Sequence, residues 1–287
     1  MVQMTAASLV PALYLVATPI GAARDITLRA LDILRDADVI AAEDTRTLRK
    51  LLDIYRISTK DRMVLPYHDH TGAGTRQKLV EAVQNGRSVA LVSEAGTPLV
   101  SDPGYNLVRD VADAGLHVYA APGPSALLAA LCVSGLPTDR FLFAGFPPAK
   151  AAARTRWLED LAHARTTAVL YESPRRIEAT LDALVSICGP DRKAAMCREL
   201  TKRFEETLRG TLAELAAQIA GRDSLKGEVV LVLGSGGPSR TDHGNMDRLI
   251  SAALDRLSLK DAVAEVTQAT GLSRRDVYQR ALDLAKD

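Results

Sequence analysis

The chain has 287 residues, of which 47% are apolar and 25% are charged, and its formal net charge is +1. This composition is that of a globular protein with a sizeable core, and the length suits two modest domains or one large one. The near-neutral balance excludes a strongly basic coat for nucleic acid, so any contact with RNA has to come from a local patch.

The first 135 residues alternate between short apolar runs and helical periodicity, which predicts five rounds of strand then helix. Asp25 is positioned to cap the first of these helices, whose Leu28, Leu31 and Leu34 share one face. Alternating strands and helices predict a parallel sheet covered on both faces, with ligands bound outside the carboxyl ends of the strands. The expected strands are residues 13–18, 39–42, 63–66, 88–92 and 117–121.

The segments that follow these strands are rich in small residues, prolines and hydroxyls, notably 17–21, 93–98 and 121–126. None carries G-x-G-x-x-G or G-x-x-x-x-G-K-[ST], which argues against a standard dinucleotide or P-loop nucleotide site. Segment 17–21 by itself favours a plain turn. Segment 93–98 and the turn just after it favour a cofactor held by main-chain groups, because glycine allows close backbone approach. Ser125 is suited both to this role and to capping a helix.

A second α/β unit with a mixed sheet is predicted after residue 135, and a helical extension follows it. The expected domains are residues 1–135, 136–234 and 235–287, with a Gly/Ser/Pro-rich linker at 235–245. The extension resembles a small helix-turn-helix, and Ser273 with Asp276 resembles a capping box. Its basic and acidic residues balance, so packing or dimer contact is as well supported as RNA contact.

Charged residues at the ends of the strands are the candidates for chemistry. Glu43 and Asp44 are suited to acid–base catalysis or to capping the next helix, and capping is the default for either alone. Glu172, Arg175 and Arg176 indicate a phosphate or ribose contact, or a surface salt bridge. The mixed charges of residues 198–206 usually mean a solvated face.

The remaining features predict a reduced, metal-free protein of the cytoplasm. The three cysteines lack C-x-x-C spacing and form no disulfide framework or zinc site: Cys132, Cys188 and Cys197. His68 and His70 could form a metal pair on a strand, although a loop beside a cleft is the favoured interpretation. The longest apolar stretches, 6–20 and 116–133, are interrupted by prolines, so no signal peptide or membrane span is expected.

Taken together, the turn motifs resemble one family. They are LVATPIG (15–21), DITLRAL (25–31), AAEDTR (41–46), SEAGTP (93–98), SDPGY (101–105), PGPSA (122–126), SGLPTDRF (134–141), YESP (171–174), RELTK (198–202) and KGE (226–228). In order and without large gaps, they are similar to the ribosomal RNA small subunit methyltransferase I family of the tetrapyrrole methylase superfamily. Three positions depart from its pattern, Ala22, Glu94 and Arg176, where Asn, Asp and His are expected.

The resemblance implies an α/β tetrapyrrole methylase fold whose two domains trap S-adenosylmethionine, a small C-terminal helical extension, and a homodimer. It implies 2'-O-methylation of one decoding-centre cytidine in 16S ribosomal RNA, with no metal and no membrane. The cofactor-binding residues expected from the motifs are Thr18, Pro19, Gly21, Ser93, Glu94, Ala95, Gly96, Thr97, Pro98, Pro122, Gly123, Ser125, Ala126, Tyr171 and Gly227.

Methyl transfer to a weakly nucleophilic hydroxyl calls for alignment and benefits from a general base. The hypothesis names Asp44 or Glu172 as the base, and it gives the RNA contacts to Arg46, Arg175, Arg176 and Lys202. Two alternatives stay open: a methyltransferase acting on a small corrin-type precursor, and a non-catalytic RNA-binding factor of ribosome assembly. Cofactor binding would separate the second alternative from an enzyme.

Overall fold

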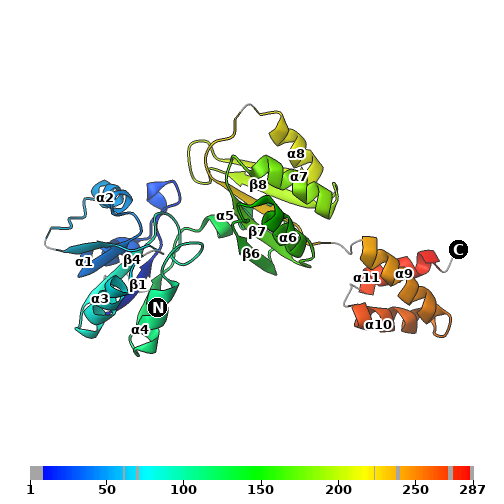
Figure 1. Cartoon of the computed structure of the whole chain (residues 1–287), viewed down its shortest axis with the longest axis horizontal. Coiled ribbons are helices and arrows are strands. Elements are labelled where there is room, and N and C mark those ends of the chain that lie inside the picture. Colours follow the sequence, from blue (N-terminus) through cyan, green and yellow to red (C-terminus); the bar gives the residue numbers. More distant parts are fainter. Residues whose placement is uncertain are drawn as a thin grey trace.

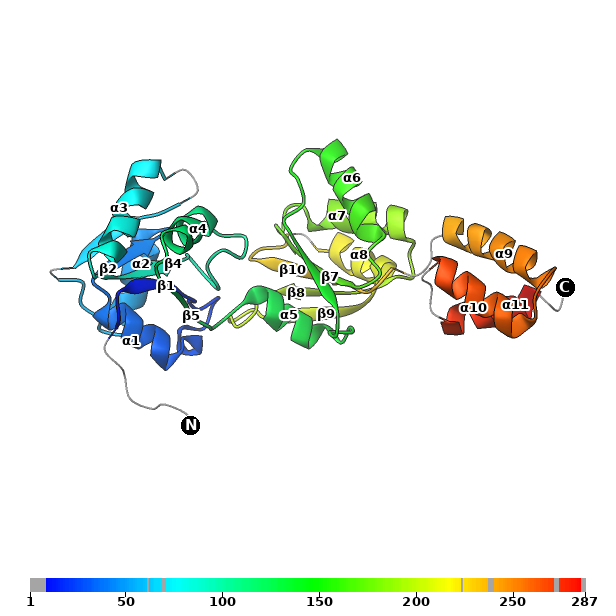
Figure 2. The same cartoon turned by 90° about the horizontal axis from the view of Figure 1, so that it is seen from below.

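The computed structural model describes residues 9–60, 62–68, 71–222, 224–236, 240–270 and 274–284. Its elements form two α/β groups and a C-terminal group of helices. The three groups lie in a row, with the N-terminal sheet at one end and the C-terminal helices at the other (Figures 1 and 2).

The N-terminal sheet is parallel, as predicted, with strand order β3-β2-β4-β1-β5. The central strand β4 and its neighbour β2 are buried at every residue, which explains their nearly continuous apolar sequences. The strands are β1 (Ala12–Val16), β2 (Val39–Ala42), β3 (Met63–Pro66), β4 (Ser88–Val92) and β5 (Val118–Ala121).

Helices cover both faces of this sheet. Ile33 and Leu34 of α1 (Leu28–Asp36) and Leu48 and Leu52 of α2 (Thr45–Ile54) pack into one core cluster. On the opposite face, α3 (Ala73–Gln84) and α4 (Tyr105–Asp113) supply apolar side chains to a second cluster. All four crossovers therefore leave the carboxyl ends of the strands uncovered, and this edge is where the turn motifs lie.

The start of α1 differs from the expectation. Asp25 ends a short 3₁₀ helix (Ala23–Asp25), and Thr27 is the N-cap of α1, its hydroxyl accepting from the Ala30 amide at 3.1 Å. Leu28 is 81% exposed, and the buried positions are Ala30, Ile33 and Leu34. The prediction of the buried face was wrong because it considered only the leucines. The face that packs on the core also includes the smaller Ala30 and Ile33.

The second sheet is mixed, as predicted, with order β6-β7-β10-β8-β9; only the β6–β7 pair is parallel. Its helices pack on one face around Leu158, Leu181 and Leu215. The elements are β6 (Phe141–Gly145), α6 (Ala151–Ala162), β7 (Thr167–Glu172), α7 (Ile177–Cys188), β8 (Lys193–Arg198), β9 (Glu206–Thr211), α8 (Leu212–Ala220) and β10 (Val229–Leu233).

Helix α5 (Ala126–Ser134) follows the last strand of the first sheet but packs on the second one. Leu127, Ala130 and Leu131 lie against Val230 and Val232 of β10, on the face opposite α6–α8. A domain boundary after residue 135 places this helix on the wrong side, since the chain crosses between the sheets at the turn 122–125. The helix is apolar on all sides, so its periodicity cannot show which sheet it covers.

The C-terminal helices α9 (Arg240–Leu254), α10 (Leu259–Thr270) and α11 (Arg274–Leu284) share their own small core, which includes Ile250, Val263 and Val277. Helix α9 begins at Arg240, so half of the expected linker 235–245 is helical. The expected capping residue Ser273 lies outside the described residues. Arg165 donates to the Thr270 carbonyl at 3.0 Å and connects this group to the second α/β unit. Among the helices described, none is both long and apolar enough to cross a membrane.

Candidate functional site

Two turns meet at the carboxyl edge of the first sheet. Thr18 and Gly96 exchange main-chain hydrogen bonds of 2.9 and 3.0 Å and form an isolated bridge beyond the ends of β1 and β4. The Ser93 hydroxyl donates to the Gly96 carbonyl at 3.2 Å, and Gly96 has φ +83°, a conformation that favours glycine. The predicted segments 18–21 and 93–98 are thus brought together and held by backbone geometry.

The third predicted segment, 122–126, adjoins the other two. The Thr97 hydroxyl donates to the Pro124 carbonyl at 3.0 Å, and Gly123 lies so close to the first turn that an added Cβ would be 2.9 Å from that of Ala17. Ser125 is the N-cap residue of α5, although its side chain makes no capping hydrogen bond. Pro122 and Gly123 are exposed, so their backbone is open to a ligand.

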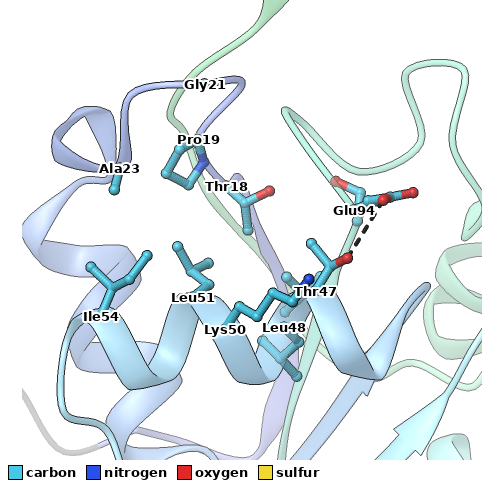
Figure 3. Close-up of a pocket in the computed structure, with 12 residues that line it drawn as sticks. Thr18, Pro19, Gly21, Ala23, Thr47, Leu48, Lys50, Leu51, Ile54 and Glu94 are labelled. Atoms are coloured by element: carbon cyan, nitrogen blue, oxygen red, sulfur yellow. Dashed lines mark hydrogen bonds between the residues drawn. The ribbon is translucent and has the colours of Figure 1, made fainter. Parts of the chain in front are cut away.

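A pocket of about 190 Å³ opens beside these turns (Figure 3). One wall contains the predicted residues Thr18, Pro19, Gly21, Ser93 and Glu94. The opposite wall is α2, which the sequence analysis did not assign. Seven lining residues, most of them on α2, were not predicted from the sequence: Ala23, Thr47, Leu48, Lys50, Leu51, Ile54 and Val92. Positions 47, 51 and 54 recur at helical spacing, and this second stripe beside the core stripe was the available signal.

The pocket contains an unpaired hydroxyl. Thr18 is 2% exposed, and no described residue is hydrogen-bonded to its buried Oγ1. Figure 3 shows this oxygen on the side of the gap that faces Glu94. Buried hydroxyls are nearly always hydrogen-bonded, so an unpaired one at a binding edge indicates a polar group of a ligand.

Asp44 caps α2, the helix that forms one wall of the pocket. Its carboxylate accepts from the amides of Arg46 (2.7 Å) and Thr47 (3.4 Å) and forms an ion pair with the Arg46 guanidinium at 3.1 Å. The side-chain hydrogen bond from Arg46 lowers the pKa of Asp44, and the backbone amides add to this effect. The capping alternative weighed for Asp44 is confirmed, and its role in acid–base catalysis stays a prediction.

Glu172 has a different environment. It is 2% exposed, and its two oxygens accept from the Ser173 amide (2.7 Å), the Arg176 guanidinium (2.8 Å) and the Thr180 hydroxyl (2.7 Å). These donors all belong to the turn and helix that follow β7. The contacts favour a structural role in which Glu172 holds the start of α7, while the neighbouring Arg175 is exposed.

Lys202 is also engaged within the protein. Its ammonium group pairs with Glu199 at 2.9 Å and Glu228 at 3.0 Å. Burial alone would lower the pKa of Lys202, but the hydrogen bonds to these two carboxylates outweigh it and raise the pKa. Gly227, with φ +96°, leaves room for the Glu199 side chain, so an added Cβ would clash with it.

The same segment connects the two α/β units. The Thr201 hydroxyl accepts from the Ala22 amide at 3.0 Å, and a Cβ on Gly21 would lie 2.6 Å from that hydroxyl. Thr201 itself has φ +63°, an uncommon conformation for a branched residue. Thus the turn after β1 is held from the first sheet by Gly96 and from the second unit by Thr201.

An apolar hollow lies between the units next to this contact. It is lined by Ile20, Ala126, Cys197, Leu200, Glu228 and Val230. Tyr171 packs in the same cluster, edge-on to Phe143 and Phe146, and burial raises the pKa of its phenol. Ala126 and Tyr171 are therefore close to the predicted cofactor turns, although they come from the second sheet and its covering helix.

The part of the chain described here contains no cluster of three or more His, Cys, Asp or Glu side chains that could hold a metal ion. The expected histidine pair is not testable, because His70 lies outside the described residues. The His68 amide donates to the Thr71 hydroxyl at 2.7 Å in a loop after β3.

The fold of this chain is similar to that of known proteins. The family model of the Tetrapyrrole (Corrin/Porphyrin) Methylases matches residues 12–216, and that of the RsmI C-terminal HTH domain matches residues 241–285. Among solved structures, cobalt precorrin-4 methyltransferase superposes with a TM-score of 0.54 at 17% identity, covering 78% of this chain and 95% of that one. A diphthine synthase gives a TM-score of 0.57 at 17% identity, covering 77% and 89%. The chain is thus a methyltransferase of the tetrapyrrole methylase fold.

Sequence relatives identify the family within this class. "Ribosomal RNA small subunit methyltransferase I" of Mesorhizobium japonicum is 48% identical over 98% of this chain and 95% of that protein. The proteins of the same name from Mycobacterium tuberculosis and Synechocystis are 43% and 42% identical, covering 96% of this chain and 96% and 99% of theirs. The chain belongs to the ribosomal RNA small subunit methyltransferase I family, as its turn motifs predicted.

Proposed function

We propose that this protein transfers a methyl group from S-adenosylmethionine to the 2'-hydroxyl of a decoding-centre cytidine, cytidine-1402, in 16S ribosomal RNA. The proposed setting is the cytoplasm, the acceptor is the small ribosomal subunit, and the active form is a homodimer. The observation that supports this most strongly is the full-length similarity to proteins named for small-subunit ribosomal RNA methylation.

The residues at the carboxyl edge fit S-adenosylmethionine. The unpaired Thr18 hydroxyl offers a hydrogen bond, and the exposed turn at Pro122 and Gly123 offers main-chain groups without side-chain obstruction. Ile20, Ala126 and Tyr171 supply apolar surface beside them. A solved structure of similar fold, the uroporphyrin-III C-methyltransferase of Thermus thermophilus complexed with S-adenosylhomocysteine, superposes with a TM-score of 0.51 at 20% identity.

When bound, S-adenosylmethionine supplies a methyl group already activated by its sulfonium. The protein's task is then alignment, because holding the acceptor oxygen in line with the methyl carbon accounts for much of the acceleration. The Thr18–Gly96 bridge and the contact between Thr97 and Pro124 fix the three turns relative to one another. These contacts give the edge the rigidity that alignment needs.

Asp44 is the residue proposed to accept the hydrogen of the acceptor hydroxyl, since it is a carboxylate with a lowered pKa at the start of α2, the helix that lines the pocket. Its lowered pKa makes it a weak base, so its main effect is to orient the hydroxyl. Glu172 is proposed to act indirectly, by holding the turn that presents Arg175. Arg46 and Arg175 are proposed as RNA contacts, whereas Arg176 and Lys202 already pair with carboxylates.

The test is to incubate the protein with radiolabelled S-adenosylmethionine and small subunits that lack the modification, and to map the labelled nucleotide. Label on the ribose of one decoding-centre cytidine supports the proposal. Label on another nucleotide, or none despite measurable S-adenosylhomocysteine binding, overturns it. Asp44→Asn keeps a capping side chain and is expected to lower turnover at least 10-fold with unchanged cofactor affinity.

A further inference from the structure

The α2 wall of the pocket exposes apolar surface that the core covers only in part: Leu51 packs at the edge of the core cluster, and Ile54 lies outside it. Leu48 and Leu52 face the core of the first domain, with 3% and 2% exposure. Leu51 and Ile54 point instead toward Pro19 and Ala23 across the pocket, and Ile54 is 61% exposed (Figure 3). An apolar surface left open inside a pocket is best explained by an apolar ligand surface that covers it.

The polar end of the same pocket is formed by Thr47 and Glu94. The Thr47 hydroxyl lies 3.5 Å from Glu94 Oε1, and Figure 3 shows both side chains at one end of the gap, away from Ile54. The Glu94 amide donates to the Glu43 carboxylate at 3.3 Å, which holds the backbone that carries this side chain. The pocket therefore pairs an apolar wall with a carboxylate acceptor at its end.

The carboxylates at the polar end of the pocket favour ligand groups that donate hydrogen bonds. Glu43, Asp44 and Glu94 place three carboxylates close together, and the adjacent Arg46 is engaged by Asp44. Such a group repels phosphate but accepts N–H and O–H donors. Lys50, further along α2, is exposed and also lines the pocket, so its ammonium group is available to a phosphate of the bound nucleic acid.

The size of the pocket limits what enters. Its volume of about 190 Å³ is below the roughly 300 Å³ at which pockets for drug-sized ligands begin. A single pyrimidine ring is small enough for this space, and a larger ligand would extend beyond it. Flat rings with one donor edge match a slot that has aliphatic walls and a carboxylate end.

We propose that the pocket between α2 and the turn after β1 binds the base of the acceptor cytidine. In this arrangement, Leu51 and Ile54 cover the ring, and the Glu94 carboxylate accepts from the exocyclic amino group, which uracil lacks. Lys50 contacts a neighbouring phosphate. This inference rests on the proposed function and adds to it a pocket and a residue that discriminate cytidine from uridine. It moves Glu94 from the cofactor set to the acceptor set and leaves Thr18, on the opposite wall of the pocket, as a cofactor contact.

The decisive experiment compares wild type with Glu94→Gln on small subunits carrying either cytidine or uridine at the acceptor position. We expect wild type to prefer cytidine by about 10- to 100-fold in kcat/KM. Because a carboxamide offers both a donor and an acceptor, Glu94→Gln should reduce this preference at least 10-fold. Glu94→Asp keeps the carboxylate and should retain the preference. The affinity for S-adenosylhomocysteine should be equal in all three proteins.

The outcomes separate the two proposals. If wild type labels no cytidine, the proposed function fails. If wild type labels cytidine but Glu94→Gln keeps the full preference for it, the base pocket is wrong and the proposed function stands. Loss of S-adenosylhomocysteine affinity in Glu94→Gln would return this residue to the cofactor site and also overturn the inference.

A charge-matched pair tests the phosphate contact. Lys50→Glu should raise KM for the small subunit about 10-fold and reduce the salt dependence of binding by about one phosphate contact. Lys78→Glu makes the same change at an exposed position of α3 and should leave both quantities unchanged. Equal effects of the two substitutions would show a general charge effect and remove Lys50 from the proposal.

Discussion

The two sheets present edges of opposite character. At the carboxyl edge of the first sheet, the turns after β1 and β5 are small and uncharged, and the three turns are held by one bridge and two hydroxyl contacts. At the corresponding edge of the second sheet, the register places Glu172, Arg198 and Glu206 on adjacent strands around Val229. Their charges are satisfied by ion pairs within the same unit.

This difference shows that charge at a strand end is a poor guide to a binding site. Glu172, Arg176 and Lys202 looked suited to substrate, yet their partners are their own neighbours. The first edge also has charged residues, among them Glu43, Asp44 and Glu94, but it retains an unpaired hydroxyl and exposed glycine backbone as well. A better guide is a polar group that has no hydrogen-bond partner within the protein, because such a group is available to a ligand.

The largest expected effect concerns Glu172. Replacing it with alanine leaves Arg176 without its partner and should lower the free energy of unfolding by about 3–5 kcal/mol, as breaking a buried ion pair commonly does. Urea denaturation measures this, and Glu178→Ala at an exposed position of α7 is the control, expected to change stability by less than about 0.5 kcal/mol. Unchanged stability combined with lost turnover would instead assign Glu172 to the chemistry.

The next effect is a pH dependence at the second edge. The hydrogen bonds from Arg222, helped by Arg198, lower the pKa of Glu206 from 4.5 to about 2. A lowered pKa means that the pair stabilises the fold above about pH 4.5 and that this contribution disappears as the pH falls towards 2. The contribution is at most about 3 kcal/mol. Unfolding of wild type and Glu206→Gln should therefore differ at pH 7 and converge near pH 2; a constant difference would contradict the assignment.

The smallest effect tests the first edge and has opposite signs for stability and binding. Thr18→Val removes a buried unpaired hydroxyl, so it should raise the free energy of unfolding by about 1 kcal/mol. It should also weaken S-adenosylhomocysteine binding about 10-fold, the value of one hydrogen bond.

Thr267 in α10 provides the matched control, because its Oγ1 is likewise buried without a described partner. Thr267→Val should stabilise the protein to a similar extent and leave cofactor affinity unchanged. If Thr18→Val binds S-adenosylhomocysteine as tightly as wild type, the unpaired hydroxyl is not a cofactor contact, and the contrast between the two edges loses its main support.

The sequence by itself determined the local elements and the place of the site. The bounds of β2, β3 and β4 and the parallel first sheet followed from short apolar runs alternating with helical periods, because burial on both faces imposes that pattern locally. The turns at 18–21, 93–98 and 122–126 were recognisable because parallel strands bring their carboxyl ends to one edge.

Only the tertiary structure decided which groups remained available there. The crossing of α5 to the second sheet and the α2 wall opposite Thr18 depend on contacts distant in sequence. The ion pairs of Glu172 with Arg176 and of Lys202 with Glu199 join residues three or four positions apart, and they depend on the direction that each side chain takes. An apolar helix has no period that selects its sheet, and an opposite charge three or four residues away does not show whether the two side chains pair or remain available to a ligand. These choices follow from packing, which the linear order of residues does not encode locally.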